Sequence, residues 1–287
     1  MKKVLLLGKT GPIGAEFVRR LDSHEDFELG SPDLDWRTAS YEAKVKALMD
    51  CTAVVSAIPR RHSLEVVEGI AAINPGLVIY DCSGIHRGKE GWEYALPELN
   101  PQLIKGTTRL VGPGCFATAA SLALWPIRNQ IDTRSAVHIE AIGGASTGGK
   151  KWVTFFEENP EQDLIVPNTG LNHPHIPEIK SNLGVQALEL RMVPQLARRY
   201  RGTTMAIHGD LKTSEEVPYS EHPFTSGRVV HRNKTPQWGE VVGTDEVHVY
   251  WVQEGSRFTV HVAFDNLGKG SVGQALQSLA IVTGENH

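Results

Sequence analysis

The sequence predicts a two-part α/β protein: a Rossmann-type, doubly wound parallel sheet, joined to a second α+β domain that carries a largely antiparallel sheet. Three observations support this prediction. An apolar run at 4–7 leads into spaced glycines and an amphipathic stretch; strand and helix patterns then alternate; and from residue 136 onward extended segments follow one another with few helices between them. Alternation favours a parallel sheet covered on both faces, whereas consecutive strands favour antiparallel pairing.

The length of 287 residues is enough for two modest domains, each with its own core. We expect residues 1–125 together with 270–287 to form the first domain and residues 126–269 to form the second. The apolar patterns predict strands at 4–7, 27–29, 53–57, 77–80, 136–141, 188–193, 203–208, 247–252 and 257–264. Helical periodicity is clearest at 15–21, 63–72, 119–124 and 270–282.

Composition and charge indicate an ordinary globular protein that acts on small molecules. Hydrophobic residues make up 40% of the chain, and the net charge of -4 provides no global attraction to nucleic acid or an anionic membrane surface. No stretch reaches the roughly 18 apolar residues that a membrane span needs. Three widely spaced cysteines fit neither a disulfide framework nor a metal site, so we expect a reducing, cytoplasmic setting and no metal.

The glycine spacing after the first strand predicts a dinucleotide-binding turn. Gly8, Gly11 and Gly14 lie between the apolar strand and the amphipathic helix, where glycine lets the backbone turn sharply and approach a pyrophosphate. Amide groups at the helix N-terminus then stabilise the phosphate charge. Further residues expected to contact the cofactor are Thr10, Pro12 and Ile13 in this turn and Ala57 and Pro59 after the 53–57 strand.

The segment after the second strand favours NADP over NAD without settling the choice. Asp33 and Asp35 are of the type that holds a ribose 2′-hydroxyl and repels a 2′-phosphate, whereas Arg37 with Ser31 would accept that phosphate. We favour the second interpretation and expect Arg37 to contact NADP.

Cys115 is the candidate nucleophile. It follows Gly112-Pro113-Gly114 and begins a helical stretch, so it lies where the helix dipole favours a thiolate. Cys51 and Cys82 have no such context and are interpreted as small buried hydrophobic residues.

The segment around Cys115 resembles the nucleophile signature of the N-acetyl-gamma-glutamyl-phosphate reductase family, within the wider aspartate-semialdehyde-dehydrogenase-like superfamily. The resemblance runs along nearly the whole chain, because several other segments match the family in the same order. These segments are 81–87 (DCSGIHR), 94–100 (YALPELN), 144–146 (GAS), 173–179 (HPHIPEI) and 265–270 (DNLGKG), the last leading into 273–275 (GQA).

The resemblance implies NADP-dependent reduction of an acyl phosphate to an aldehyde through a Cys115 thioester, with a dinucleotide-binding first domain and a catalytic and dimerisation second domain. His173 and His175 become the candidate acid/base residues, and the choice between them stays open. With one residue between them, they would project to the same side only in an extended segment. The other implied contacts are Ser83, Asn266 and Gly268 with the cofactor, and Arg87, Ser146 and Lys150 with the substrate.

The chain departs from the family pattern at Ile85, Pro174 and Lys150, and it is short for the family, which leaves the acyl group open. N-acetyl-gamma-glutamyl phosphate is the first expectation, a carrier-linked or otherwise modified amino-acyl phosphate the second, and aspartyl phosphate the third. The basic cluster at 198–201 would suit an acidic carrier protein, although ordinary solvated surface is the favoured interpretation. The resemblance also implies a homodimer or homotetramer.

Two other functions are compatible with a dinucleotide-binding turn, and the sequence argues against both. A redox-sensing dinucleotide-binding protein would need neither an activated thiol nor a nearby proton carrier, so Cys115 and the histidine pair argue against it. A short-chain dehydrogenase would need a Tyr-x-x-x-Lys pair, which is missing from the expected region.

Overall fold

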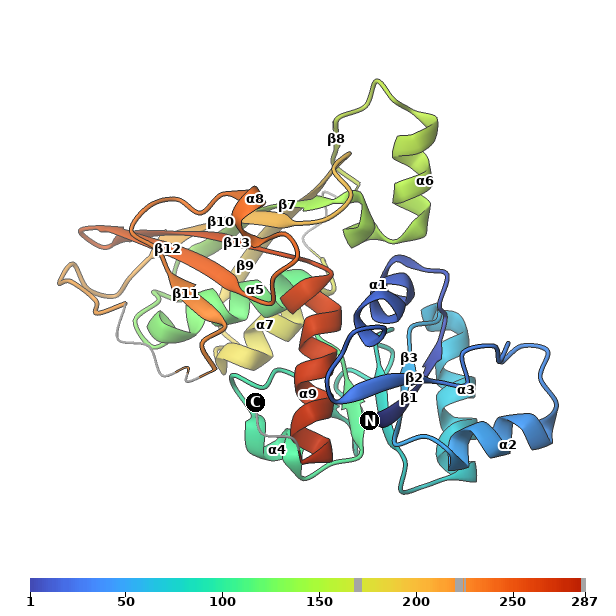
Figure 1. The fold of residues 1–287 in the computed structure, drawn as a ribbon. Helices are drawn as coiled ribbons and strands as arrows, with labels where there is room; N and C mark the ends of the chain where they lie inside the picture. Colours follow the sequence, from blue (N-terminus) through green and yellow to red (C-terminus); the bar gives the residue numbers. More distant parts are fainter. Residues whose placement is uncertain (168–171, 220–223, 225, 285–287) are drawn as a thin grey trace. The chain divides into compact units, whose positions relative to one another are not determined.

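The structure, a computed structural model, describes residues 1–167, 172–219, 224 and 226–284. It separates into two compact units, the first formed by residues 1–113 and 271–287 and the second by residues 114–270. In Figure 1, the first unit runs from blue into green and ends with the red C-terminal segment, and the second unit runs from green through yellow to orange.

The first unit is built on a six-stranded sheet in the order β2-β1-β3-β4-β6-β5, with every neighbouring pair parallel. Its strands are β1 (Lys2–Leu7), β2 (Phe27–Gly30), β3 (Ala53–Ser56), β4 (Val78–Asp81), β5 (Glu93–Tyr94) and β6 (Arg109–Val111). Its helices are α1 (Pro12–Leu21), α2 (Tyr41–Met49), α3 (Arg60–Ile73), α4 (Pro101–Lys105) and α9 (Gly273–Thr283).

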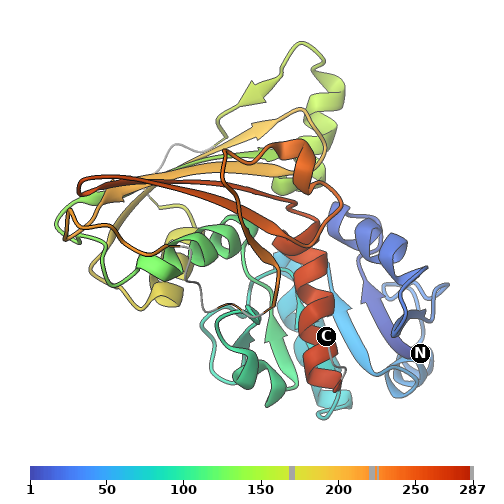
Figure 2. The ribbon, with the colours of Figure 1, turned by 60° about the vertical axis from the view of Figure 1, so that its left-hand side comes forward.

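Both faces of this sheet are buried, which explains why its strands are continuous apolar runs. Val4 and Leu6 of β1 pack with residues of α1 and α9 on one face, whereas Leu5 and Leu7 pack with residues of α2 and α3 on the other. The C-terminal helix α9 therefore completes the first unit, and it lies beside the sheet in both Figure 1 and Figure 2.

The second unit carries a seven-stranded mixed sheet in the order β11-β12-β13-β10-β7-β9-β8. Its strands are β7 (Ala136–Gly144), β8 (Leu164–Ile165), β9 (Glu189–Ala197), β10 (Thr203–Asp210), β11 (Val229–His231), β12 (Val247–Glu254) and β13 (Arg257–Phe264). Its helices are α5 (Cys115–Leu124), α6 (Lys150–Glu158), α7 (His175–Leu183) and α8 (Trp238–Val241), with short 3-10 turns at Trp125–Ile127 and Ala145–Gly148 and a π-helical turn at Gly268–Val272 that leads into α9.

Alternate residues of these strands face a core on one side only. On β7, Val137, Ile139 and Ala141 are buried while the residues between them are partly exposed. Helices α5 and α7 cover the buried side, as both ribbon views show. Residues 116–124 of α5 are all buried, which fits a helix in which Thr118 and Ser121 are the only polar residues of that stretch.

The predicted fold class is confirmed: a parallel, doubly wound sheet precedes a unit whose sheet is antiparallel at β8-β9, β7-β10, β10-β13 and β12-β13. The chain divides at Gly114 rather than near residue 125, because α5 packs on α7 and β13 and so belongs to the second unit. Residues 285–287, which we had included in the first domain, lie outside the described residues.

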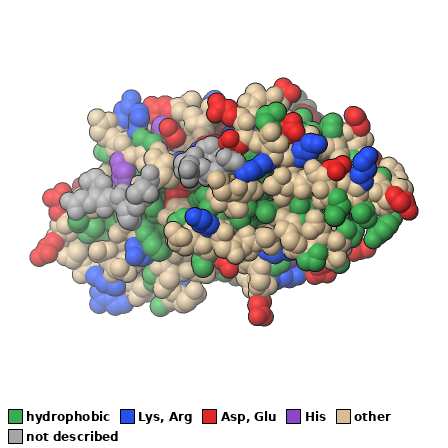
Figure 3. All heavy atoms as spheres, turned by 60° about the horizontal axis from the view of Figure 1, so that its bottom comes forward, with side chains coloured by type: hydrophobic (Ala, Val, Ile, Leu, Met, Phe, Trp, Pro, Cys, Tyr) green, Lys and Arg blue, Asp and Glu red, His purple; other side chains and the backbone are tan. Residues whose placement is uncertain are grey.

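The described part of the chain contains no helix long and apolar enough to cross a membrane. Lys and Arg side chains are interspersed with Asp and Glu on the face shown in Figure 3, as the small net charge suggests.

Candidate active site

The glycine turn between β1 and α1 has the geometry of a phosphate cradle. Gly8 has a φ of +87°, in the left-handed region, and a Cβ on it would lie 2.5 Å from the carbonyl oxygen of Ala57. A Cβ on Gly14 would overlap the carbonyl oxygen of Gly8. Helix α1 begins at Pro12 with Gly11 as its N-cap, so its first amide groups are available to an anion. The structure thus brings the predicted turn residues and Ala57 together.

Gly14→Ala is expected to lower the free energy of unfolding by about 1–3 kcal/mol, because the added methyl group would overlap backbone that cannot rotate away. Chemical denaturation of both proteins measures the difference. Gly69→Ala is the matched control: Gly69 lies within α3, nothing lies within 4 Å of a Cβ there, and the replacement should stabilise by about 0.5–1 kcal/mol. Equal stability of the Gly14 variant and the parent would contradict the cradle geometry.

The loop after β2 holds Arg37 in an ion pair with Asp35. The guanidinium Nε and Nη2 lie 3.1 and 2.9 Å from the two carboxylate oxygens, and the pair is exposed. Hydrogen bonding from Arg37 lowers the pKa of Asp35 below its ordinary value. The ammonium group of Lys9, from the glycine turn, donates to the carbonyl of Pro32 in this loop, so a second cation lies near the segment of Arg37. Lys9 was not among the predicted site residues.

A buried carboxylate organises the ends of β3 and β4. Asp81 accepts hydrogen bonds from Ser63 Oγ at 3.0 Å and from the Ser83 amide at 2.8 Å, and His86 Nδ1 lies 2.9 Å from its second oxygen. Ser63 Oγ is also 2.9 Å from Ser56 Oγ. Of this network, only Ser83 had been assigned to the site from the sequence.

Arg87 contacts the segment that precedes the candidate nucleophile Cys115. Its Nε donates to the carbonyl of Gly112 at 2.9 Å, and its guanidinium lies over Gly84, where a Cβ would come within 2.5 Å of Cζ. At least one donor of Arg87 therefore supports the backbone of the first unit, in addition to the substrate contact that we had predicted.

Cys115 is the first residue of α5, as predicted, with Gly114 as the N-cap. Its neighbourhood leaves little space, since a Cβ on Gly270 would lie 3.0 Å from the Cβ of Cys115. The position at the N-terminus of a buried helix favours the thiolate form of the side chain.

His175 and His173 lie beside the start of α5. A Cβ on Gly114 would overlap the Nε2 atom of His175, so this ring packs directly on the backbone that precedes Cys115. The two imidazole centroids are 4.6 Å apart, and the ring of Phe116 lies 5.8 Å from that of His175. We had expected the two histidines to project to the same side only if their segment were extended. The segment is not extended, since Pro174 has helical angles of φ -61° and ψ -18° and α7 begins at His175, yet the two rings lie side by side.

The two histidines are not equivalent. His173 Nδ1 accepts a hydrogen bond from the His175 amide at 3.2 Å, and burial lowers the pKa of His173. Both observations favour the neutral form of His173 as a local acceptor, whereas the His175 ring packs on the residue that precedes Cys115.

Helix α7 is fixed to α5 by two further contacts. Glu178 is buried and accepts a hydrogen bond from the Gly114 amide at 3.0 Å, and Asn182 Nδ2 donates to Ser121 Oγ at 2.9 Å. His175, Glu178 and Asn182 recur at helical spacing on the face of α7 that meets α5. Glu178 lies in the matched 173–179 segment, but it was not among the residues predicted for the site.

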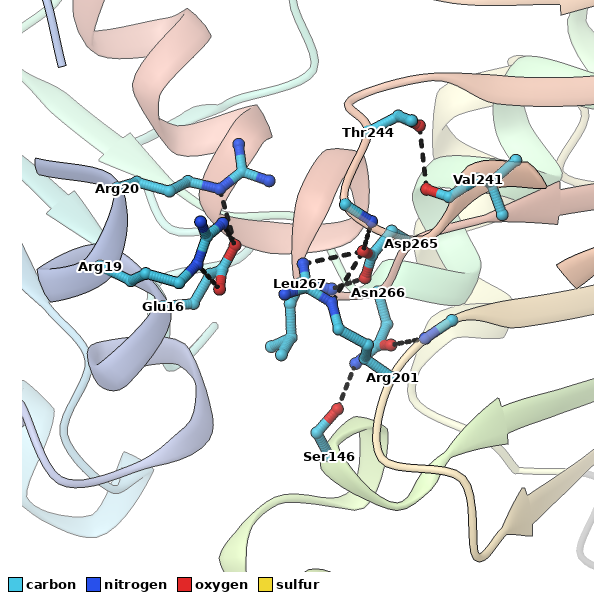
Figure 4. Close-up of polar contacts among 12 residues, drawn as sticks. Glu16, Arg19, Arg20, Ser146, Arg201, Val241, Thr244, Asp265, Asn266 and Leu267 are labelled. Carbon is cyan, nitrogen blue, oxygen red and sulfur yellow. Dashed lines mark hydrogen bonds and ion pairs between the residues drawn. The ribbon is translucent and has the colours of Figure 1, made fainter. Parts of the chain in front are cut away.

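A second polar cluster surrounds Asp265 (Figure 4). Its carboxylate pairs with Arg201 at 2.8 Å and accepts hydrogen bonds from the amides of Gly243 and Leu267. The Asn266 side chain accepts a hydrogen bond from the Gly202 amide at 2.8 Å. Its Nδ2 donates a hydrogen bond to Ser146 Oγ at 2.9 Å. These contacts hold the predicted residues Ser146 and Asn266 together inside the second unit.

Gly268 and Lys150 lie at the edges of this region. A Cβ on Gly268 would overlap the carbonyl oxygen of Thr244, so glycine is required for this close approach. Lys150 is the exposed first residue of α6.

The arginines at 198–201 make contacts within the second unit. Arg198 pairs with Asp163 at 3.0 Å, Arg201 pairs with buried Asp265, and the Arg199 guanidinium lies 5.6 Å from the Trp238 ring centroid. This cluster is therefore not a uniform, solvated basic patch.

The other two cysteines have environments that disfavour a thiolate. Burial raises the pKa of Cys51 to about 11, and burial together with the charge of Asp81 raises the pKa of Cys82 well above its ordinary value. Among the three cysteines, Cys115 alone begins a helix.

Comparison with known proteins places this arrangement in a class. A family model described as "Semialdehyde dehydrogenase, dimerisation domain" matches residues 115–266. The structure of aspartate semialdehyde dehydrogenase II complexed with ASA from Vibrio cholerae superposes with a TM-score of 0.77 at 16% identity, covering 99% of this chain and 98% of that one. Aspartate semialdehyde dehydrogenase with NADP from Candida albicans gives a TM-score of 0.68 at 14% identity, covering 98% of both. The fold is that of the semialdehyde dehydrogenases.

Sequence similarity is closer to one branch of that class. The N-acetyl-gamma-glutamyl-phosphate reductase of Bradyrhizobium sp. (strain ORS 278) is 32% identical over 310 residues, which cover 98% of this chain and 95% of the relative. The chain belongs to the N-acetyl-gamma-glutamyl-phosphate reductase family. The resemblance recognised from the sequence motifs is thus confirmed.

Proposed function

We propose that the protein is an NADP-dependent reductase that converts N-acetyl-gamma-glutamyl phosphate to its semialdehyde and inorganic phosphate. The observation that supports this most is the placement of Cys115 at the N-terminus of α5, with His175 packed against the preceding residue and Glu178 bonded to its amide. The relatives that cover nearly the full chain carry the name of this activity.

The reaction begins when the Cys115 thiolate attacks the acyl carbon and phosphate leaves, forming a thioester. The oxyanion of the tetrahedral intermediate needs hydrogen-bond donors, and the N-terminal amides of α5 point in the direction that suits that role. When bound, NADPH supplies the hydride that reduces the thioester. The resulting thiohemiacetal collapses to the aldehyde, and the thiolate is regenerated.

His175 is the residue that we assign to proton transfer. The collapse of the thiohemiacetal requires removal of its hydroxyl proton, and formation of that hydroxyl requires a proton donor. His173, whose pKa is lowered by burial and whose Nδ1 accepts a hydrogen bond from the His175 amide, positions its neighbour.

The first unit fits a dinucleotide. The cradle formed by Gly8 and Gly14 has space that a Cβ would fill, and the α1 N-terminus offers amides to a pyrophosphate. A structural relative was determined with NADP. We assign Gly8, Thr10, Gly11, Pro12, Ile13 and Gly14 to the pyrophosphate region, Arg37 to the 2′-phosphate, and Ala57, Pro59, Ser83, Asn266 and Gly268 to the remaining contacts.

Substrate recognition is assigned to Arg87, Ser146 and Lys150, which supply cations and a hydroxyl for the phosphate and carboxylate groups. Free N-acetyl-gamma-glutamyl phosphate is favoured over a carrier-linked substrate. The carrier hypothesis depended on the arginines at 198–201, and Arg198 and Arg201 are engaged with acidic residues of the same unit. We also infer a homodimer or homotetramer, in line with the description of the matched family model.

The reverse reaction tests the proposal. N-acetyl-glutamate semialdehyde, phosphate and NADP are mixed with the protein, and absorbance of the reduced cofactor is followed. A phosphate-dependent signal is expected. No signal, with NADPH binding still measurable, would move the assignment to another acyl phosphate; cofactor binding without alkylation of Cys115 would favour a redox sensor instead.

Arg37→Ala is expected to weaken NADPH binding about tenfold and to change NADH binding less than about twofold, because the guanidinium would bond a phosphate that only NADPH carries. Dissociation constants from the change in protein fluorescence measure both. Arg134→Ala is the matched control, since Arg134 forms the same exposed pair with Asp132 in the second unit. Equal affinity of the parent for the two cofactors would refute the NADP assignment.

A further inference from the structure

The network around Asp81 ties two loops of the first unit to one buried carboxylate. Ser56 is the last residue of β3 and precedes the predicted cofactor residue Ala57, and Ser63 lies in the first turn of α3, just after Pro59. Ser83 and His86 lie in the loop after β4. Asp81 is fully buried and connects these two loops through the hydrogen bonds described above.

The direction of these hydrogen bonds follows from the carboxylate, which only accepts. Ser63 therefore donates to Asp81 and accepts from Ser56, and His86 donates from Nδ1. The His86 side chain is 1% exposed, and its ring stacks on Trp92 with centroids 3.9 Å apart and planes inclined by 18°. Within the described part of the chain, His86 Nε2 has no hydrogen-bond partner. The orientation of this ring thus depends on Asp81 and the Trp92 stack.

The network lies at the ends of β3 and β4, next to the point in the sheet where the order of the strands reverses. In the order β2-β1-β3-β4, the strand sequence reverses between β1 and β3. Ligands of such sheets bind outside the carboxyl ends of the strands at this point. If the pyrophosphate binds at the β1-α1 turn and the 2′-phosphate beyond β2, the other half of the dinucleotide would lie near the ends of β3 and β4, where Ser56 and Asp81 are found.

We propose that Asp81 and His86 are positioning residues for the nicotinamide half of the cofactor. Asp81 holds the β3-α3 loop through Ser63 and the loop after β4 through the Ser83 amide, and His86 fixes the carboxylate by occupying its second oxygen. This inference rests on the proposed NADP-dependent function and adds residues to it that make no contact with substrate themselves.

The test compares two ligands that differ only in the nicotinamide. In His86→Phe, an aromatic ring still stacks on Trp92 but the donor to Asp81 is lost. NADPH is expected to bind about tenfold more weakly, the effect of losing a hydrogen bond to a charged group. Binding of 2′-phospho-ADP-ribose, which lacks the nicotinamide, is expected to stay within about twofold of the parent. General damage to the unit would weaken both ligands equally, and that outcome, like no change in either, would overturn the proposal.

Two more variants keep the test decisive if His86→Phe does not fold. His86→Asn retains an N–H donor near the position of Nδ1 and is expected to restore NADPH binding to within about threefold of the parent. Ser63→Ala removes the other side-chain donor and is expected to weaken NADPH selectively, whereas Ser278→Ala, which removes a buried hydroxyl from α9 of the same unit, should not. Equal NADPH affinity in Ser63→Ala and the parent would refute the positioning role.

The outcome is separable from that of the proposed function. If the parent protein binds neither NADPH nor 2′-phospho-ADP-ribose, the cofactor assignment itself fails. If the parent binds both and the variants bind NADPH equally well, only the role of Asp81 and His86 fails.

Discussion

Cys115→Ser is expected to lower turnover by at least about 10⁴-fold while leaving the dissociation constant of NADPH unchanged. A serine hydroxyl at this position is far less acidic than a thiol, and the helix N-terminus that favours a thiolate cannot ionise it. Removal of a nucleophile that acts as part of a unit generally costs most of the catalysed rate. The measurement is the phosphate-dependent reduction of NADP by the semialdehyde, with cofactor binding measured in parallel.

Cys51→Ser and Cys82→Ser are the controls for this experiment. Both thiols are disfavoured as thiolates by burial, so neither replacement should change turnover more than about threefold. Mass spectrometry after brief treatment with iodoacetamide should show alkylation at Cys115 in the parent and little at the other two positions. Substantial turnover by Cys115→Ser would exclude a covalent mechanism.

The fold was largely predictable because its signals are local. The β1 strand, the glycine turn and α1 follow one another directly, and the apolar runs at 53–57 and 77–80 became β3 (Ala53–Ser56) and β4 (Val78–Asp81). Helices α2 and α6 are among the elements that were not predicted: the apolar periodicity of α2 is weak, and α6, although amphipathic, is only nine residues long.

The candidate site was predictable only where its residues lie in one motif. Cys115 and the histidine pair were identified from sequence segments, and their proximity is a property of α5 packing on α7. Contacts between distant positions gave no local signal: Asn266 meets Ser146 across 120 residues, and Arg201 meets Asp265 across 64. Arg201 was therefore interpreted as part of a surface cluster, whereas it forms an ion pair with a carboxylate that is fully buried.

The sequence left open whether His173 or His175 is the acid/base residue. From the surroundings of the two rings, we predict that it is His175. His175→Gln is expected to lower turnover by about 10² to 10⁴-fold, the usual contribution of a general acid–base residue, because its Nε2 atom packs against the residue that precedes Cys115. His173→Gln is expected to lower turnover by no more than about tenfold, because glutamine still offers an acceptor to the His175 amide and burial already lowers the pKa of His173.

The pH dependence of the two variants distinguishes chemistry from packing. A group that gives and takes a proton contributes an ionisation to the profile of kcat/KM, so the His175→Gln profile should lose one limb that His173→Gln retains. Thermal unfolding of both variants provides the control for structural damage. If His173→Gln lost the limb and most of the activity while His175→Gln kept them, the assignment would be reversed, and His173 would be the proton carrier.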